Sequence, residues 1–128
     1  MKQVIQTNQA PAAIGTYSQA IQANNHVYIS GQIPLNPQTM TMIEGDINAE
    51  IRQVFDNFFA IMAAAGGNAG NVVKVNIYLT DLSNFPLVNE IMMAYFPAPY
   101  PARAVIGVSA LPKNARVEMD GILVLDVF

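Results

Sequence analysis

Hydrophobic residues recur every three or four positions in the segment that follows Asp46, the spacing of a helix with one buried face. This stripe consists of Ile47, Ile51, Val54, Phe55, Phe58, Phe59, Ile61 and Met62. Asp46 is a natural N-cap, and Gly66-Gly67 follows the last turn, where glycine commonly ends a helix. The pattern therefore predicts a long helix between Asp46 and Gly66.

A second, shorter stripe with the same period begins near Asn84. Its apolar positions are Leu87, Val88, Ile91, Met92 and Tyr95. Pro86 is tolerated in the first turn of a helix, whereas Pro97, Pro99 and Pro101 forbid its continuation. We expect a second helix that ends before Pro97.

Elsewhere the pattern has the period of two that is typical of half-buried strands. One strand is predicted where Val73, Val75, Ile77 and Leu79 alternate with Lys74, Asn76, Tyr78 and Thr80. The turn signal Asn24-Asn25 separates two more strands, Ala20–Ala23 and Val27–Ser30. Two final strands are expected from Arg103 to Ala110 and from Arg116 to Val127.

The order of these elements, ββ-α-β-α-ββ, predicts an α+β fold in which both helices pack on one face of a mixed sheet. The other face would then be uncovered. Because side chains alternate along a strand, Glu118 and Asp120 fall on the face opposite Val117 and Met119. We expect the uncovered face to form a subunit interface, with clefts at its edges.

Length and composition support an assembly of identical chains. The 128 residues correspond to one domain, residues 1–128. Apolar residues make up 52% and charged residues only 12%, about half the ~25% of an ordinary soluble domain. A monomer with so few charges would expose apolar surface to water. Because contact between identical chains buries such surface, we expect a homo-oligomer.

The charge balance and the missing residue types exclude several classes of function. The net charge of −3 gives no electrostatic footprint for a phosphate backbone, so no nucleic acid partner is expected. Without cysteine and with one histidine, His26, a chain has no thiolate nucleophile and no site of two histidines, and we expect no metal. The longest apolar run, Phe58 to Ala65, is far shorter than a membrane span, and the N-terminus lacks the apolar stretch of a signal peptide. We expect a cytoplasmic protein without a membrane partner.

Two charged residues are candidates for chemistry. Arg103 follows three prolines and opens an apolar segment, where it either pairs with a carboxylate of the protein or binds one on a ligand. Glu118 is either a structural carboxylate or a group that holds an attacking water. His26 follows a turn and is expected to be solvated, and the glycines between Gly66 and Gly70 follow a helix, so they are not aimed at a phosphate. The residue types alone do not choose between these alternatives.

Six segments resemble, in order and spacing, the reactive intermediate deaminase (YjgF-type) family over essentially the whole chain. They are Gly15-Thr16-Tyr17-Ser18-Gln19-Ala20, Ser30-Gly31-Gln32-Ile33-Pro34-Leu35, Asn89, Pro101-Ala102-Arg103, Leu111-Pro112 and Val117-Glu118-Met119-Asp120. The resemblance implies a chorismate-mutase-like fold and a homotrimer with sites between subunits. It also implies a cofactor-independent 2-iminobutanoate/2-iminopropanoate deaminase. Such an enzyme hydrolyses enamines and imines such as 2-aminoacrylate, released by pyridoxal-phosphate enzymes, to 2-keto acids and ammonium.

The same resemblance implies roles for individual residues. Arg103 would bind the substrate carboxylate, and Glu118 would position the attacking water. Tyr17, reaching the site of a neighbouring chain, would complete the catalytic set. The pocket would be lined by Ser30, Gly31 and Asn89, with a backbone contact from Val105.

Some positions depart from the family pattern. Thr16 stands where proline is usual, Ala104 where serine or threonine is frequent, Val105 where some members have cysteine, and Gly121 where alanine is common. We expect the change at Thr16 to loosen the loop that carries Tyr17. Two other functions stay open: a non-catalytic protein that binds 2-keto acids or related carboxylates, and an endoribonuclease or translation inhibitor.

The topology decides whether the two candidate charges can share a site. If the last two strands formed a hairpin, Glu118 would oppose Val108 and lie about 17 Å along the strand from Arg103. In the family fold the last strand instead inserts antiparallel beside earlier strands, with the strand Val72–Thr80 between it and the strand of Arg103. We expect the inserted topology.

Overall fold

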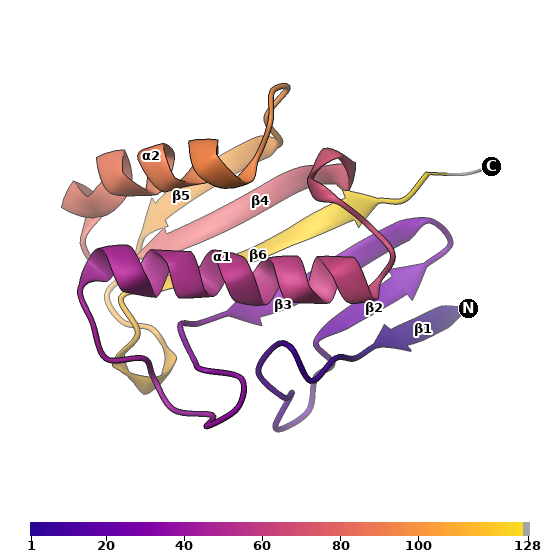
Figure 1. Ribbon diagram of the computed structural model, residues 1–128, viewed down its shortest axis with the longest axis horizontal. Helices are drawn as coiled ribbons and strands as arrows, with labels where there is room; N and C mark the ends of the chain where they lie inside the picture. Colours follow the sequence, from indigo (N-terminus) through magenta and orange to yellow (C-terminus); the bar gives the residue numbers. More distant parts are fainter. Residues whose placement is uncertain (127–128) are drawn as a thin grey trace.

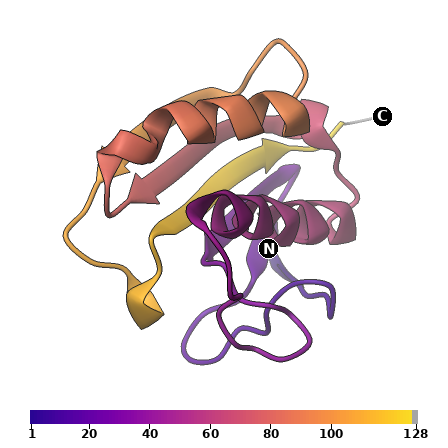
Figure 2. The ribbon, with the colours of Figure 1, turned by 60° about the vertical axis from the view of Figure 1, so that its left-hand side comes forward.

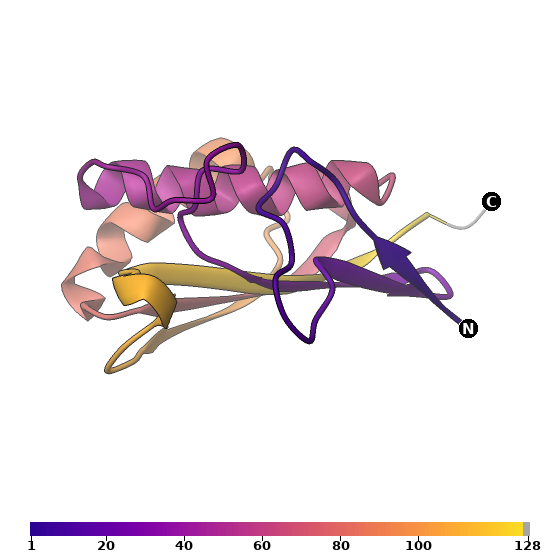
Figure 3. The same ribbon diagram turned by 90° about the horizontal axis from the view of Figure 1, so that it is seen from below.

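The fold has two layers, a six-stranded mixed sheet and a pair of helices that cover one of its faces (Figures 1 and 3). A computed structural model describes residues 1–126. The strands are β1 (Lys2–Ile5), β2 (Ala20–Ala23), β3 (His26–Gln32), β4 (Val72–Leu79), β5 (Ala102–Gly107) and β6 (Val117–Val124). The helices are α1 (Ile47–Ala64) and α2 (Phe85–Tyr95), with short 3₁₀ turns η1 (Ala69–Asn71), η2 (Leu82–Asn84) and η3 (Pro112–Asn114). The predicted α+β arrangement, with both helices on one face, is confirmed.

Both helices begin and end where the sequence pattern indicates. The Asp46 side chain caps α1 by accepting a hydrogen bond of 2.9 Å from the backbone N–H of Ala49. After α1 the chain turns at Gly66, whose φ of +83° suits glycine. Helix α2 has Pro86 in its first turn and ends when Phe96 becomes extended. These signals are local, which explains why the sequence alone places the helices well.

The last strand is inserted into the middle of the sheet, as expected, and does not form a hairpin with β5. The strand order is β1-β2-β3-β6-β4-β5. Strand β6 pairs antiparallel with both β3 and β4, whereas β4 and β5 are parallel. Strand β5 is therefore an edge strand, and β4 separates it from β6.

Several details of the strand predictions are wrong. Strand β1, at the other edge of the sheet, was not predicted because its residues are largely exposed and show no buried alternation. Val73 is 44% exposed, since a bulge between Val72 and Lys74 shifts the alternation by one residue. Strand β5 ends at Gly107 instead of Ala110, and β6 covers Val117–Val124. The predicted end at Val127 lies outside the described residues.

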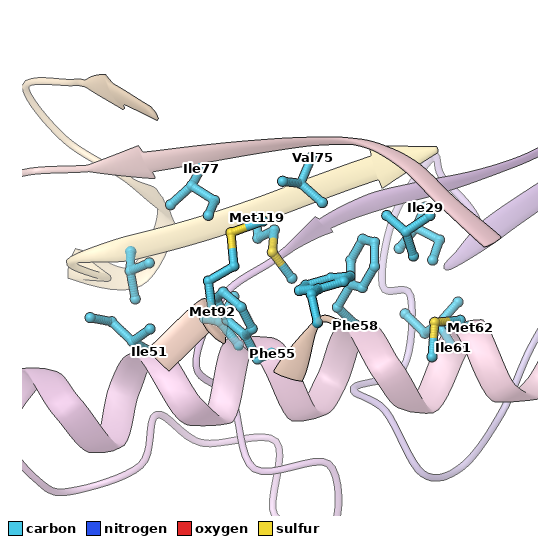
Figure 4. Packing of buried hydrophobic residues seen from close by; sticks show 14 of the residues in the cluster. Ile29, Ile51, Phe55, Phe58, Ile61, Met62, Val75, Ile77, Met92 and Met119 are labelled. Carbon is cyan, nitrogen blue, oxygen red and sulfur yellow. The ribbon is translucent and has the colours of Figure 1, made fainter. Parts of the chain in front are cut away.

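The core lies between α1 and the middle of the sheet (Figure 4). Phe55 and Phe58 of α1 are fully buried beneath strand residues such as Ile77 and Met119. Gly121 is part of this packing, because an added Cβ would lie 2.6 Å from the carbonyl oxygen of Lys74 and 2.8 Å from the ring of Phe58. Gly121 therefore allows β6 to lie close under α1.

The open face of the sheet carries polar side chains among apolar ones. Asp120 of β6 accepts hydrogen bonds from Asn76 Nδ2 (2.8 Å) and Tyr78 Oη (2.9 Å) on β4. Burial and the neighbouring Asp120 raise the pKa of Tyr78 above its usual value. Tyr28 and Ile106 are exposed on the same face. Within residues 1–126, neither helix has the length and apolarity needed to span a membrane.

Candidate active site

Arg103 lies on the edge strand β5 and points toward α2. It is in register with Val75 of β4, whose side chain is buried on the helix-covered face. Its Nη1 donates hydrogen bonds to Asn89 Oδ1 (2.9 Å) and Met92 Sδ (3.7 Å), and its guanidinium carbon lies 5.1 Å from the centre of the Phe85 ring. An amide, a thioether and an aromatic ring thus hold the guanidinium without neutralising it.

A cavity of about 480 Å³ opens beside this guanidinium. Its lining residues are Asn89, Met92, Met93, Tyr100, Pro101 and Arg103. Among the described residues, no carboxylate lies within 4.0 Å of Arg103, and the ion pair that the structure contains joins Arg116 to Glu50. Of the two alternatives for Arg103, an internal salt bridge is therefore excluded for the described residues.

The backbone of β5 offers hydrogen-bonding groups next to Arg103. The N–H of Val108 donates to the Leu79 carbonyl oxygen (2.9 Å), so it points toward β4. Because backbone groups alternate in direction along a strand, the N–H of Val105 points the other way, toward the edge that has no partner among the described strands. Val105 can therefore provide the backbone contact that was predicted for it.

Glu118 lines a different cavity, of about 580 Å³, which we call the Glu118 cavity. Tyr17, Ser30 and Gly31 also line this cavity, together with Lys113 of η3. Its walls come from the loop before β2 and the loop between β3 and α1, which lie side by side at one end of the sheet (Figures 1 and 2).

Gly31 makes room for the carboxylate of Glu118. A Cβ added to Gly31 would overlap Glu118 Oε2 and lie 2.9 Å from Glu118 Cδ. Burial, and secondarily the charge of Asp120, raise the pKa of Glu118 above its usual value. A half-buried carboxylate with a raised pKa is a common form of a group that holds or accepts a proton.

Hydrogen bonds hold the loop that carries Tyr17. The buried Gln19 amide accepts from the N–H of Thr7 (2.8 Å) and donates to the carbonyl oxygens of Thr7 (3.0 Å) and Pro11 (2.7 Å). Ser30 Oγ donates to the Ser18 carbonyl oxygen (2.5 Å). Tyr17, which is 52% exposed, extends from a loop that is fixed at its base.

The structure divides the predicted residues between two places. Arg103 and Asn89 share one cavity with Val105 nearby, whereas Tyr17, Ser30, Gly31 and Glu118 share the other. Within one chain, Arg103 faces the helices and Glu118 faces the open side of the sheet, with β4 between their strands. Within one chain Tyr17 and Glu118 line the same cavity, and the expected reach of Tyr17 into the site of a neighbouring chain stays a prediction.

Phe85 and Met92 are contacts of Arg103 that the sequence analysis missed. They stand four positions before and three positions after Asn89 on α2, and residues at these spacings share one face of a helix. Once Asn89 was a candidate, this spacing could have identified both neighbours. Among residues 1–126, no group of three histidine, cysteine, aspartate or glutamate residues could hold a metal ion.

Comparison with known proteins gives matches over nearly the whole chain. The family model described as endoribonuclease L-PSP matches residues 7–125. A 2-iminobutanoate/2-iminopropanoate deaminase from Dermatophagoides farinae is 46% identical, and the match covers 98% of each chain. The crystal structure of RidA from a Psychrobacter species matches with a TM-score of 0.92 and 53% identity, covering 96% of this chain and 99% of the other. Escherichia coli TdcF, crystallised with bound serine, matches with a TM-score of 0.90 and 35% identity, covering 97% and 99%.

Proposed function

We propose that this chain, which belongs to the endoribonuclease L-PSP family, hydrolyses small 2-imino acids. Within that family it is related to the reactive intermediate deaminases. The products are a 2-keto acid and ammonium, as for a 2-iminobutanoate/2-iminopropanoate deaminase. The observation that carries this proposal is Arg103, an arginine at a cavity with no carboxylate partner among the described residues. The serine bound to TdcF supports a site for a small carboxylate.

We further propose that each site forms between two chains of a homotrimer. The Arg103 and Glu118 groups lie on opposite sides of one sheet, so one small substrate cannot contact both within a chain. A ring in which the β5 edge of one chain meets the Glu118 cavity of the next would bring them together, since head-to-tail contacts form a ring when the rotation between neighbouring chains closes. The apolar side chains exposed on the open face, including Tyr28 and Ile106, favour burial in this assembly.

In this proposal, Arg103 and the β5 edge bind the substrate carboxylate. A guanidinium fork donates two parallel hydrogen bonds to a carboxylate, and Arg103 keeps N–H groups for this after its bond to Asn89. The N–H of Val105 adds a donor at the strand edge. Binding fixes the direction of the C=N bond relative to the neighbouring chain.

Glu118 of the neighbouring chain orients the water. The ionised carboxylate takes a proton from the water as the water oxygen adds to the carbon of the protonated imine, and the C=N bond becomes the C–N single bond of a carbinolamine. Glu118 returns this proton to the amine nitrogen, the C–N bond breaks, and the departing ammonia takes the hydroxyl proton, which leaves the keto group and ammonium. A protonated imine is already electrophilic, so orientation and charge complementarity suffice and no metal or cofactor is required. Tyr17 closes the cavity from its fixed loop.

The test couples the protein to a serine or threonine dehydratase and follows keto-acid appearance at high pH, where spontaneous hydrolysis is slow. We expect the protein to speed keto-acid formation, and Arg103→Ala to lose at least about 100-fold in kcat/KM while the assembly stays intact. Arg52→Ala is the matched control, because Arg52 is an exposed arginine on α1 that lines neither cavity. Unchanged turnover by Arg103→Ala would remove Arg103 from its proposed role.

A protein that only binds 2-keto acids would use the same contacts to the carboxylate. Glu118→Gln separates the two functions, since the amide has nearly the same shape but cannot take up a proton. We expect this variant to keep its affinity for pyruvate and to lose imine hydrolysis. If Glu118→Gln and the unmutated protein give the same rate of imine hydrolysis, the protein only binds 2-keto acids and the imine hydrolyses in solution.

A further inference from the structure

A third cavity, of about 300 Å³, adjoins the Glu118 cavity. We call it the amide cavity, because Gln6, Asn8, Gln9 and Gln38 contribute to its lining. The two cavities have two lining residues in common, Ala12 and Met40. Met40 has the larger side chain of the two, since that of Ala12 is a single methyl group.

The backbone at Met40 is held in an unusual conformation. Its φ of +59° lies in the left-handed region, which L-residues with side chains rarely adopt. The N–H of Met40 donates to the Asn36 carbonyl oxygen (2.8 Å), and the N–H of Asn36 donates to the Thr41 carbonyl oxygen (2.9 Å). The amide of Asn57 on α1 donates to the Leu35 carbonyl oxygen (3.0 Å) at the base of this loop. The loop is thus fixed, and with it the position of Met40.

The two cavities that Met40 lines differ in polarity, because apolar side chains are prominent in the Glu118 cavity and amide side chains in the amide cavity. Around the Glu118 cavity, Ile14, Ile33, Leu35 and Pro112 provide an apolar wall next to Met40. If the imine carbon lies near Glu118, the side chain of the substrate extends along this wall. On that premise a longer aliphatic side chain extends toward Met40, the larger of the two residues that both cavities share.

We propose that Met40 is a specificity-determining residue that limits the length of the substrate side chain. This inference rests on the proposed deaminase function and adds to it a residue outside the groups that bind the carboxylate and the water. Truncation at Met40 would join the two cavities and lengthen the space for the side chain. One methylene in an apolar pocket changes specificity by about 10-fold or more, so loss of three heavy atoms should have a clearly measurable effect.

The experiment compares Met40→Ala with Met42→Ala, a matched truncation in the same loop at a half-buried methionine that lines neither cavity. A D-amino-acid oxidase with catalase generates the imines of D-alanine, D-norvaline, D-norleucine and D-2-aminooctanoate. We expect Met40→Ala to raise kcat/KM for the longest imine relative to the shortest by about 10-fold over the unmutated protein. Met42→Ala should leave this ratio within about twofold.

A binding series keeps this inference separate from the proposed function. Calorimetry with the matching 2-keto acids, from pyruvate to 2-oxooctanoate, should show the same shift in relative affinity for Met40→Ala. One outcome is that Met40→Ala hydrolyses the shortest imine but changes neither the ratio of kcat/KM values nor the ratio of affinities between the longest and shortest compounds. That outcome would overturn the role of Met40 and leave the deaminase function standing. A shifted binding ratio without any imine hydrolysis would overturn the deaminase function and support Met40 as the length limit of a binding site.

Discussion

Gly31→Ala tests whether the position of the Glu118 carboxylate controls the reaction. Gly31 is exposed and its φ lies outside the left-handed region, so alanine fits its backbone without strain. The added Cβ would overlap Glu118 Oε2 and lie 2.9 Å from Cδ, closer than an ordinary van der Waals contact. The carboxylate, at the far end of a flexible side chain, must therefore move.

The size of the effect follows from this displacement. Restoring ordinary contact moves Oε2 by roughly 1 Å, and a misplacement of this size can cost about 100-fold in rate. That corresponds to about 2.7 kcal/mol of transition-state stabilisation. Because Gly31 lies at the surface, we expect the free energy of unfolding to change by less than about 0.5 kcal/mol.

The assay is imine hydrolysis coupled to a dehydratase, with stability measured by urea unfolding. Glu118→Asp alone retracts the carboxylate, and in the double variant Gly31→Ala/Glu118→Asp the overlap is relieved. We expect the two changes to be non-additive, with the double variant losing less activity than the product of the two single effects. Full activity in Gly31→Ala, or strictly additive losses, would refute the assignment of Glu118 as the group that positions the water.

Three other predictions concern charges. Asp120→Asn removes one of the causes that raise the pKa of Glu118. The low-pH limb of the kcat/KM profile, where Glu118 becomes protonated and activity falls, should therefore move to lower pH. A limb that does not move contradicts this prediction. Arg116→Ala leaves the buried Glu50 carboxylate unpaired and should lower the free energy of unfolding by about 2 kcal/mol in urea titrations, whereas a loss near zero would mean that water replaces the pair. Phe85→Leu removes the ring beneath the Arg103 guanidinium, and with it a cation–π interaction of about 0.5–1 kcal/mol. KM should therefore rise about two- to fivefold with kcat little changed. Phe85→Tyr keeps an aromatic ring and should keep the unmutated KM, and a raised KM in this variant would contradict the stacking role.

The helices were predictable because their signals are local. The N-cap at Asp46, the stripe through Phe55 and Phe58, and the prolines after α2 each act within a few residues of the helix that they define. The inserted position of β6 has no local signal, and period counting alone would favour a hairpin with β5. It was predicted from the resemblance of whole segments to a family.

The strand errors have a physical origin. Strand β1 binds its neighbour through backbone groups and buries little, so its side chains carry no pattern. The bulge at Val72 inserts one residue, which moves Val73 to the other face while the sequence still reads as an unbroken alternation. Hydrophobicity alone cannot show where a strand gains a residue.

The candidate residues could be named from the sequence, but their division between two cavities could not be predicted. Arg103 and Glu118 both stand on strands with apolar neighbours, and nothing in their local sequence indicates opposite faces of the same sheet. That follows from the register of β4 with β5 and with β6. Met40 was not a candidate, because a loop without any periodic pattern gives no sign of its left-handed backbone or of the two cavities that it lines.

Mixed assemblies test the central claim that one chain supplies Arg103 and another supplies Glu118. Arg103→Ala and Glu118→Gln chains, each inactive alone, are co-expressed with different tags, and mixed oligomers are isolated through both tags. Each mixed ring of three then has one site in three with both residues intact, so the isolated oligomers should regain about a third of the unmutated activity. If the mixed oligomers are as inactive as either parent, the two residues do not meet across an interface between chains.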